Sequence, residues 1–250
     1  NKTTVRCEVV KQCQSCVFIN SDYKKSLKLK FTNDLALLEP LLNDKKVDVL
    51  APVASDSQLA YRHSVKLAVR RSYNKTADNI WTIGLFQPGS HKTIEIPDCP
   101  VQTKDINSFV KQIKYLLSSQ TKLKPWCEKT QTGDIRYLLL RQSHKARQLM
   151  ITFVISDKSC LADLRHLSLK IRASSQVSSV WCCLANKNQN TILSSNFKKI
   201  CGSERLQESL CGVDFYVSGG SFFQINPMSA QKIYSRIMQL ATYTNTAEVV

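Results

Sequence analysis

Four cysteines constrain this chain more than any other feature of its sequence. Three of them lie close together in RCEVVKQCQSCVFIN, where Cys7, Cys13 and Cys16 follow the spacing C-x5-C-x2-C. The fourth, Cys99, lies far along the chain and directly precedes Pro100. Thiolates are the natural ligands of iron–sulfur clusters and of structural zinc, and a C-x2-C pair lets two sulfurs reach one centre from a single turn. A shared site would tie the N-terminal segment to the rest of the fold.

Three interpretations of these cysteines remain open at this point. They can be ordinary buried thiols, because a free cysteine behaves as a small apolar side chain. The residues between the first three are mostly polar or charged, however, which makes a poor core and favours a metal site. Zinc sites usually pair two C-x2–4-C knuckles, so the irregular grouping favours an iron–sulfur cluster over zinc. The spacing alone leaves zinc as the alternative.

The chain also carries a large positive charge. Its 250 residues include 35 Lys and Arg against 19 Asp and Glu, which gives a net charge of +16. Such an excess predicts a polyanionic partner, most simply nucleic acid, because neutralising phosphates gives affinity for any sequence. A basic protein without such a partner is the alternative. We expect no membrane partner, since the sequence has no apolar run of 18 or more residues and no basic stretch with an apolar face.

The remaining cysteines indicate a reducing compartment. Ten cysteines in 250 residues is well below the density of a disulfide scaffold. We therefore expect a cytoplasmic protein, monomeric, in which the six that are not candidate ligands are reduced thiols, mostly in apolar settings: Cys127, Cys160, Cys182, Cys183, Cys201 and Cys211.

The order of apolar patterns predicts an α+β fold, an antiparallel sheet with packed helices and an N-terminal cysteine-rich metal-cluster loop. The strand expected from Ser64 should have a basic outer face that includes Lys66 and Arg70. The last helix should bury Ile233 and Ile237. Helices are expected at 23–43, 103–120, 160–173 and 226–243, and strands at 64–73, 80–90, 91–96, 134–143, 148–156, 177–187 and within 197–217.

A second informative stretch is SGGSFFQINPMSAQKIY, residues 218–234. Gly219 and Gly220 permit backbone geometry closed to other residues, and Phe223 can pack or stack on a planar group. Gln224 and Asn226 carry amides suited to hydrogen-bonding a ligand. The alternative is structural: a glycine turn, a pair of core phenylalanines and an Asn that caps the following helix.

Taken together, these stretches resemble one family, the iron–sulfur RNA uracil 5-methyltransferases that use S-adenosylmethionine. The resemblance is strongest to the bacterial 23S ribosomal RNA enzymes that lack an N-terminal β-barrel. It is carried, in order, by CEVVKQCQSC, APVASDSQLAYRHSVKLAV, DCPV, TGDIRYLLLRQS with QLMITFVISDK, and GSFFQINPMSAQKIY. It implies that a 4Fe-4S cluster is held by Cys7, Cys13, Cys16 and Cys99, and that Gln224 contacts S-adenosylmethionine.

The resemblance also implies an organisation and a set of RNA contacts. It divides the chain into a cluster-binding segment (1–60, with Cys99 supplied by the next region), a central RNA-binding α+β domain (61–218) and the start of the methyl-donor region (219–250). The RNA-binding candidates are Arg62, Lys66 and Phe223. In YRHSVK, however, His63 and Ser64 replace the Asn and Lys that are usual in the family.

Members of this family attack carbon-6 of uracil with a cysteine thiolate, so that carbon-5 can take the methyl group before a base removes its proton. The family places that cysteine and base in an α/β methyltransferase domain that follows the last helix. We therefore expect that domain to be missing, no catalytic residue to lie in this chain, and the chain to be inactive alone. The alternative function is a non-enzymatic RNA-binding module, stapled by an iron–sulfur or zinc site.

Overall fold

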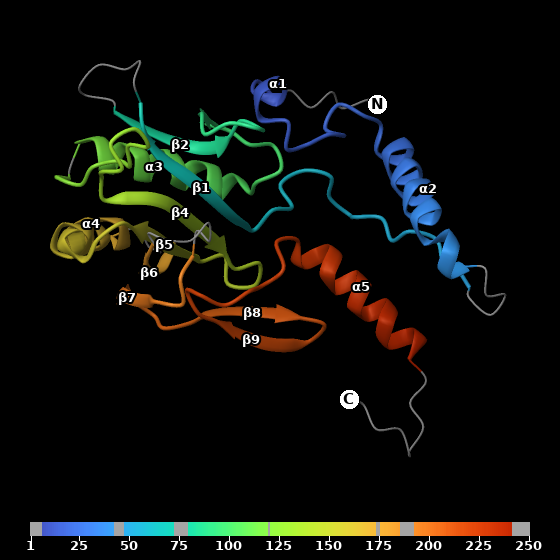
Figure 1. Ribbon diagram of the computed structural model, residues 1–250. Helices are drawn as coiled ribbons and strands as arrows, with labels where there is room; N and C mark the ends of the chain where they lie inside the picture. Colours follow the sequence, from blue (N-terminus) through green and yellow to red (C-terminus); the bar gives the residue numbers. More distant parts are fainter. Residues whose placement is uncertain are drawn as a thin grey trace.

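The structure is a computed structural model, which describes residues 7–42, 48–72, 80–119, 121–173, 176–185 and 193–241. A central sheet carries two helices on one face, and two further helices project from its end (Figure 1). The helical elements are α1 (Val10–Cys13), α2 (Tyr23–Leu42), α3 (Lys104–Ser119), the 3₁₀ turn η2 (Lys158–Cys160), α4 (Leu161–Arg172) and α5 (Pro227–Leu240). The strands are β1 (Ser64–Arg71), β2 (Trp81–Phe86), β3 (Thr93–Glu95), β4 (Ile135–Gln142), β5 (Leu149–Ile155), β6 (Val177–Leu184), β7 (Phe197–Gly202), β8 (Leu206–Leu210) and β9 (Val213–Val217).

The sheet has seven strands in the order β3-β2-β1-β4-β5-β6-β7, and it is mixed. All neighbouring pairs run antiparallel except β5 and β6, which are parallel. Their parallel direction follows from α4, because a helix between two strands returns the chain to the edge where the first strand began. The expected antiparallel sheet is therefore wrong at this pair. The sequence does place a helical pattern between two apolar runs, which is the pattern of a β-α-β unit.

The core lies between the sheet and the two helices α3 and α4. Ile106, Ile113 and Leu164 are fully buried against Ile83 and Phe153 of the sheet. The central strand β5 is buried at every position, as its unbroken apolar sequence LMITFVI requires. Thr103 caps α3, since its side-chain oxygen accepts from the backbone N–H of Ile106 at 3.3 Å. The helix expected at 103–120 is thus confirmed, as α3.

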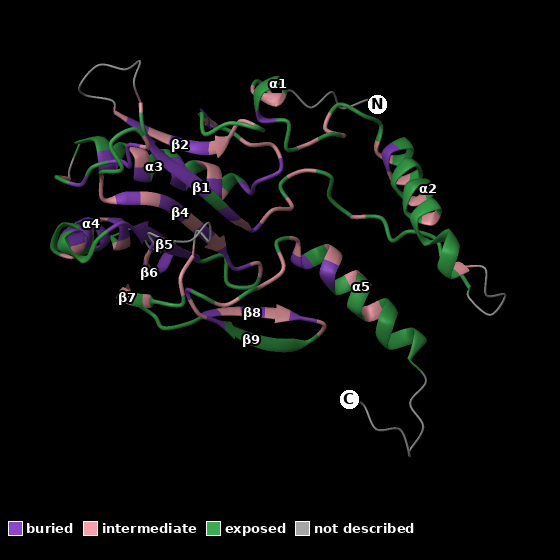
Figure 2. Ribbon diagram, viewed as in Figure 1, coloured by how far each residue is buried: buried purple, intermediate pink, exposed green. Residues whose placement is uncertain are grey.

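Two predictions about buried faces are wrong. Arg70 of β1 is only 5% exposed and does not lie on an outer basic face, because polar groups on neighbouring segments surround its guanidinium. Lys66 alone keeps the expected exposure. On α5, the residues expected to be buried, Ile233 and Ile237, are 48% and 55% exposed. Helix α5 packs instead through Ala230 and Pro227, and Figure 2 shows most of α2, β9 and α5 in green.

The hairpin β8–β9 and helix α5 are attached to the sheet mainly through its β4–β5 turn and the segment before β1. The backbone N–H of His144 donates to the Glu208 carboxylate at 3.0 Å, and Ser143 Oγ donates to the carbonyl of Gln207 at 2.6 Å. At the other side, Ser229 Oγ of α5 lies 3.1 Å from Ser55 Oγ. These polar contacts bring the segment 218–226 against the start of β1.

Candidate functional site

The first three cysteines lie on one compact turn. Helix α1 ends at Cys13, and Gln14 then takes the left-handed conformation, with φ of 49°. That residue reverses the chain, and the backbone N–H of Ile19 closes a further turn on the carbonyl of Cys16 at 3.1 Å. A left-handed residue directly after a helix is a common way to end it. The turn brings Cys7, Cys13 and Cys16 to the same side of the N-terminal segment.

Cys99 is held in place by a side chain that the sequence analysis did not single out. The amide of Asn107, on α3, accepts from the backbone N–H of Cys99 at 3.2 Å and donates to its carbonyl at 2.9 Å. The backbone N–H of Gln102 also donates to that carbonyl, at 3.2 Å. Two-sided pairing with one amide fixes the backbone of Cys99 against α3, a rigid part of the fold. The spacing of eight residues between Cys99 and Asn107 gives no signal of this contact.

All four predicted ligand cysteines line a single cavity, together with apolar residues that include Ile19, Ile96 and Pro100. Burial, reinforced by the neighbouring thiols, raises the pKa of Cys16. Burial likewise raises the pKa of Cys99, against the backbone N–H groups that face its sulfur and the charge of Arg62. Thiolates this close to one another need a positive centre, so the donor set fits a thiolate-bound metal group. Among the described residues, no three or more His, Cys, Asp or Glu side chains are arranged to hold a metal ion.

A short segment joins the cysteine cavity to the second predicted site. The backbone N–H of Ala60 donates to the carbonyl of Pro100 at 2.9 Å, and that of Arg62 to the carbonyl of Val101 at 2.8 Å. One residue later, the backbone N–H of His63 donates to the carbonyl of Ile225 at 2.8 Å. Residues 60–63 therefore lie between the Cys99 segment and the Gln224 segment, and they pair with both.

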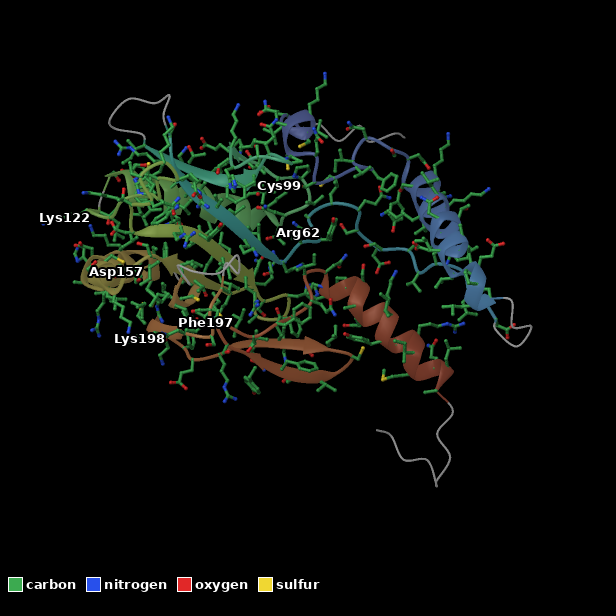
Figure 3. The ribbon with its side chains drawn as sticks, viewed as in Figure 1. Arg62, Cys99, Lys122, Asp157, Phe197 and Lys198 are labelled. Carbon is green, nitrogen blue, oxygen red and sulfur yellow. The ribbon has the colours of Figure 1, made fainter. Side chains whose placement is uncertain are left out.

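Arg62 points its charge at the cysteines. Its guanidinium lowers the pKa of both Cys16 and Cys99 against the opposing effect of burial. Figure 3 shows Arg62 and Cys99 at the same end of the sheet. Within the described part of the chain, Arg62 Nε is buried and has no hydrogen-bond partner. The predicted role of Arg62 in RNA binding stays a prediction, and its position also suits an anionic group in the cysteine cavity.

The turn at 218–221 is fixed by an arginine that the sequence analysis also missed. Arg141, at the end of β4, donates from Nη1 to the carbonyl of Ser218 at 3.2 Å and from Nη2 to that of Ser221 at 2.6 Å. Burial lowers its pKa. The glycine between these serines lies flat on an aromatic ring, because a Cβ at Gly219 would come within 2.6 Å of the Trp181 side chain. The contacts of Arg141 and of Gly219 are both possible only with the backbone path that residues 218–221 take into Phe222–Gln224.

Beyond this turn, the two phenylalanines differ in environment. Phe222 is 81% exposed, whereas Phe223 is half-buried and meets Phe215 edge-on with ring centroids 5.9 Å apart. Phe222 is therefore the more accessible of the two for stacking on a planar group. Gln224 donates from Nε2 to Tyr234 Oη at 3.2 Å, which orients its amide from α5. The predictions for Gln224 and Phe223 stay predictions.

Asn226 has the structural role that the sequence analysis left open. Its side-chain oxygen accepts from the backbone N–H of Ser229 at 3.1 Å, so it caps α5, and Pro227 follows in the first turn. Its amide is thus committed to the helix. None of the helices within the described ranges is long and apolar enough to cross a membrane.

The known proteins that are similar to this chain belong to one class. Searched against models of protein families, the chain matches none. Among curated proteins it is similar to RNA methyltransferases that are themselves uncharacterized. One from Geobacter sulfurreducens is 28% identical over 245 residues, 98% of this chain and 48% of that protein. One from Streptococcus mutans is 26% identical over 228 residues, 91% of this chain and 49% of that protein. The chain spans about half the length of these relatives.

A solved structure shares the fold. The tRNA (uracil-54, C5)-methyltransferase of Pyrococcus abyssi, in complex with S-adenosyl-L-homocysteine, matches with a TM-score of 0.70 and 21% identity. The match covers 97% of this chain and 52% of that structure. The chain therefore has the fold of a methyltransferase over nearly its whole described length. The expectation that the α/β domain is missing is overturned by this match, and the fold class is an α/β arrangement with a mixed sheet.

Proposed function

We propose that this chain belongs to an RNA (uracil-5-)-methyltransferase that uses S-adenosylmethionine and acts on ribosomal RNA. The observation that carries the proposal is the segment 60–63, which pairs with the Cys99 segment on one side and with the Gln224 segment on the other. The names of the similar proteins support methyl transfer to RNA, and the net charge of +16 supports a polyanionic substrate.

The roles of the individual residues follow from their positions. Arg62 and the exposed Lys66 stand at the start of β1, beside the Gln224 segment, and would neutralise phosphates of the substrate. Phe223, or the more exposed Phe222, would stack on a base taken out of the RNA stack. Gln224, oriented by Tyr234, would hydrogen-bond the methyl donor. When bound, S-adenosylmethionine supplies an electrophilic methyl group.

The four cysteines would hold a 4Fe-4S cluster. All four thiols line one cavity, three of them from the N-terminal turn and Cys99 from the segment before α3, where Asn107 holds its backbone. The ligands of a cluster stand around a body larger than one ion, so they need not converge as the ligands of zinc do. Zinc remains the alternative occupant. Such a group would join the N-terminal segment to the sheet at the place where Arg62 lies.

Metal analysis of anaerobically purified protein tests the cysteine site. We expect about four irons and four sulfides per chain, and their loss in Cys16→Ser. Cys211→Ser is the matched control, because Cys211 lies at the β8–β9 turn against α5, where its sulfur contacts the carbonyl of Gln231 at 3.5 Å. One zinc and no iron would favour the alternative function, an RNA-binding module stapled by zinc. Protein free of both metals would contradict the cluster.

Methyl transfer tests the reaction and the substrate together. For the whole protein to which this chain belongs, we expect labelled methyl from S-adenosylmethionine to appear in unmodified ribosomal RNA and to be reduced in Gln224→Ala. Transfer RNA is the necessary comparison, because the similar Pyrococcus abyssi enzyme is named for a tRNA uracil. Labelling of tRNA alone would correct the substrate and keep the reaction. RNA binding without methyl transfer to either RNA would favour the non-enzymatic alternative.

A further inference from the structure

A second polar cavity lies at the other end of β1, away from the cysteines. It has a volume of about 250 Å³ and is bordered by β1, β2, the segment before β3 and the segment that follows Leu123. Strand β1 runs from Ser64, beside Arg62, to Arg71 at this cavity. Nothing in the proposed function uses this cavity. Its lining consists of Arg70, Arg71, Ser72, Thr82, His91, Lys92, Thr93, Trp126 and Glu128.

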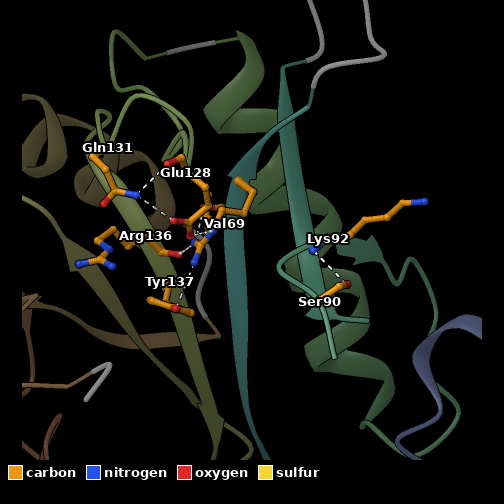
Figure 4. A network of polar contacts seen from close by, with 8 residues as sticks. Val69, Ser90, Lys92, Glu128, Gln131, Arg136 and Tyr137 are labelled. Atoms are coloured by element: carbon orange, nitrogen blue, oxygen red, sulfur yellow. Dashed lines mark hydrogen bonds and ion pairs between the residues drawn. The ribbon is translucent and has the colours of Figure 1, made fainter. Parts of the chain in front are cut away.

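Arg70 forms the floor of the cavity and is almost fully committed. Its Nη1 donates to the carbonyls of Val69 at 2.9 Å and of Arg136 at 2.6 Å, and its Nη2 donates to Tyr137 Oη at 3.0 Å. Its Nε lies 2.7 Å from Glu128 Oε1. Figure 4 shows Glu128, Arg136 and Tyr137 gathered around this point. A guanidinium has five N–H donors. Within the described ranges one N–H of Nη2 has no acceptor, and Nε contacts Glu128 as an ion pair without the geometry of a hydrogen bond.

The described lining of the cavity keeps a net positive charge after Arg70 and Glu128 are counted as a neutral ion pair. Among the described residues of the lining, Glu128 is the only carboxylate, and it is matched by Arg70. Burial opposes ionisation of Glu128, but the charge of Arg70 and hydrogen bonds from neighbouring side chains together outweigh burial and hold the pKa of Glu128 below its ordinary value. Arg71 and Lys92 are both exposed and form no ion pair within the described ranges. Two cations without an ion pair to any described residue thus border the cavity. Figure 4 shows the Lys92 side chain extended away from Glu128, Arg136 and Tyr137.

Two buried polar groups of the lining also lack partners. Trp126 is 6% exposed, and its indole Nε1 has no hydrogen-bond partner of acceptable geometry, although it faces the Glu128 carboxylate. Thr93 Oγ1 is buried without a partner as well. A buried N–H or O–H left unsatisfied is costly, so such groups usually mark the place of a water, an ion or a ligand. Donors that surround a positively charged cavity favour an acceptor-rich anion.

We propose that this cavity binds a phosphate group, either a phosphodiester of the RNA substrate or the phosphate of a mononucleotide. Arg71 and Lys92 supply the charge, and the indole of Trp126 and the hydroxyl of Thr93 supply directed hydrogen bonds. The choice of RNA as one source rests on the proposed function. The volume suits a phosphate with part of its ribose, because cavities for whole drug-sized ligands begin at about 300 Å³.

The experiment follows the indole N–H signal of Trp126 in the full 250-residue chain by ¹H–¹⁵N NMR. Trp126→Phe assigns that signal among the three tryptophans. Inorganic phosphate, uridine 5′-monophosphate and a single-stranded ribosomal RNA fragment are titrated separately, and RNA affinity is measured in parallel by fluorescence anisotropy. Lys92→Gln and Thr93→Val remove one contact each, and Lys158→Gln removes an exposed charge beside α4 as the matched control.

We expect a saturable shift of the Trp126 signal, weakened about tenfold in Lys92→Gln and unchanged in Lys158→Gln. If RNA is the source, Lys92→Gln also lowers the slope of log affinity against log salt by about 0.7. A shift with all three probes assigns a site for any phosphate group, and a shift with RNA alone assigns a diester. If RNA binds but the signal stays unmoved, the cavity is no phosphate site and the proposed function survives. If phosphate moves it but RNA does not bind, the cavity survives and the proposed function fails.

Discussion

The ion pair between Arg70 and Glu128 offers the sharpest test of how this fold is held together. Replacement of Glu128 by Gln keeps the shape of the side chain but removes the charge that matches a 5% exposed guanidinium. Breaking a fully buried pair costs about 3–5 kcal/mol, whereas a charged hydrogen bond is worth about 1.5–3 kcal/mol. The Glu128 side chain is 32% exposed, so water partly replaces the carboxylate. We therefore expect a loss of about 2 kcal/mol in the free energy of unfolding.

The pair between Lys111 and Asp98 provides the matched control. It has the same length, 2.7 Å, but its side chains are 52% and 68% exposed. Exposed pairs contribute about 0–1 kcal/mol, so Asp98→Asn should change little. For a chain of this size, 1 kcal/mol shifts the melting temperature by about 2–4 °C, which predicts a fall of about 4–8 °C for Glu128→Gln. Thermal and urea unfolding followed by circular dichroism measure both. Equal losses in the two variants would refute the reasoning, because burial would then not decide the value of the pair.

Further predictions concern pH, packing and capping. The pKa of Glu128 is lowered in the fold, so the advantage of wild type over Glu128→Gln should be present at neutral pH and vanish as pH falls through that pKa. Burial raises the pKa of Glu208, so the stability that protonated Glu208 contributes should be lost as pH rises through its folded pKa. The difference in unfolding free energy between wild type and Glu208→Gln across pH 4–8 should therefore change with pH in the opposite direction to the difference for Glu128→Gln. Gly219→Ala should destabilise by about 1–3 kcal/mol in urea unfolding, since its methyl group meets the Trp181 ring. Asn226→Ala should lose about 1 kcal/mol by the same assay, and no loss would contradict its role as a cap.

The sequence predicts the elements of this fold better than their partners. The periodicity of residues 103–120 and the apolar run of β5 depend on local spacing, and both elements occur where expected. The stripe of Ile233 and Ile237 has the same spacing as a core face, yet α5 leaves it exposed. Periodicity shows that a helix has an apolar side, and only tertiary contacts decide what covers that side.

The candidate site shows the same limit at the level of single residues. The cysteines could be predicted because their spacing carries chemistry, and the structure places all four around one cavity. Asn107 and Arg141 could not, because Asn107 pairs with the backbone of Cys99 at a spacing that carries no signal, and Arg141 bonds to backbone carbonyls 77 and 80 residues away. Arg70 was misplaced for a related reason: alternation along a strand assigns a face, and the burial of a charge depends on partners that the strand does not contain.

The length of strand β1 sets the distance between two arginines, Arg62 and Arg71. Arg62 precedes the first residue of β1, and Arg71 is its last, so a single paired strand separates the two cationic ends. Eight residues at about 3.3 Å each span about 26 Å, close to the rise of eight stacked base pairs. The strand pairs antiparallel with β4 along residues 64–68 and with β2 along residues 68–71, so both halves are hydrogen-bonded into the sheet. If an RNA contacts both ends, the distance between Arg62 and Arg71 would select the spacing of the phosphates that bind there. Recognition would then depend on the position of a phosphate as much as on which base is presented.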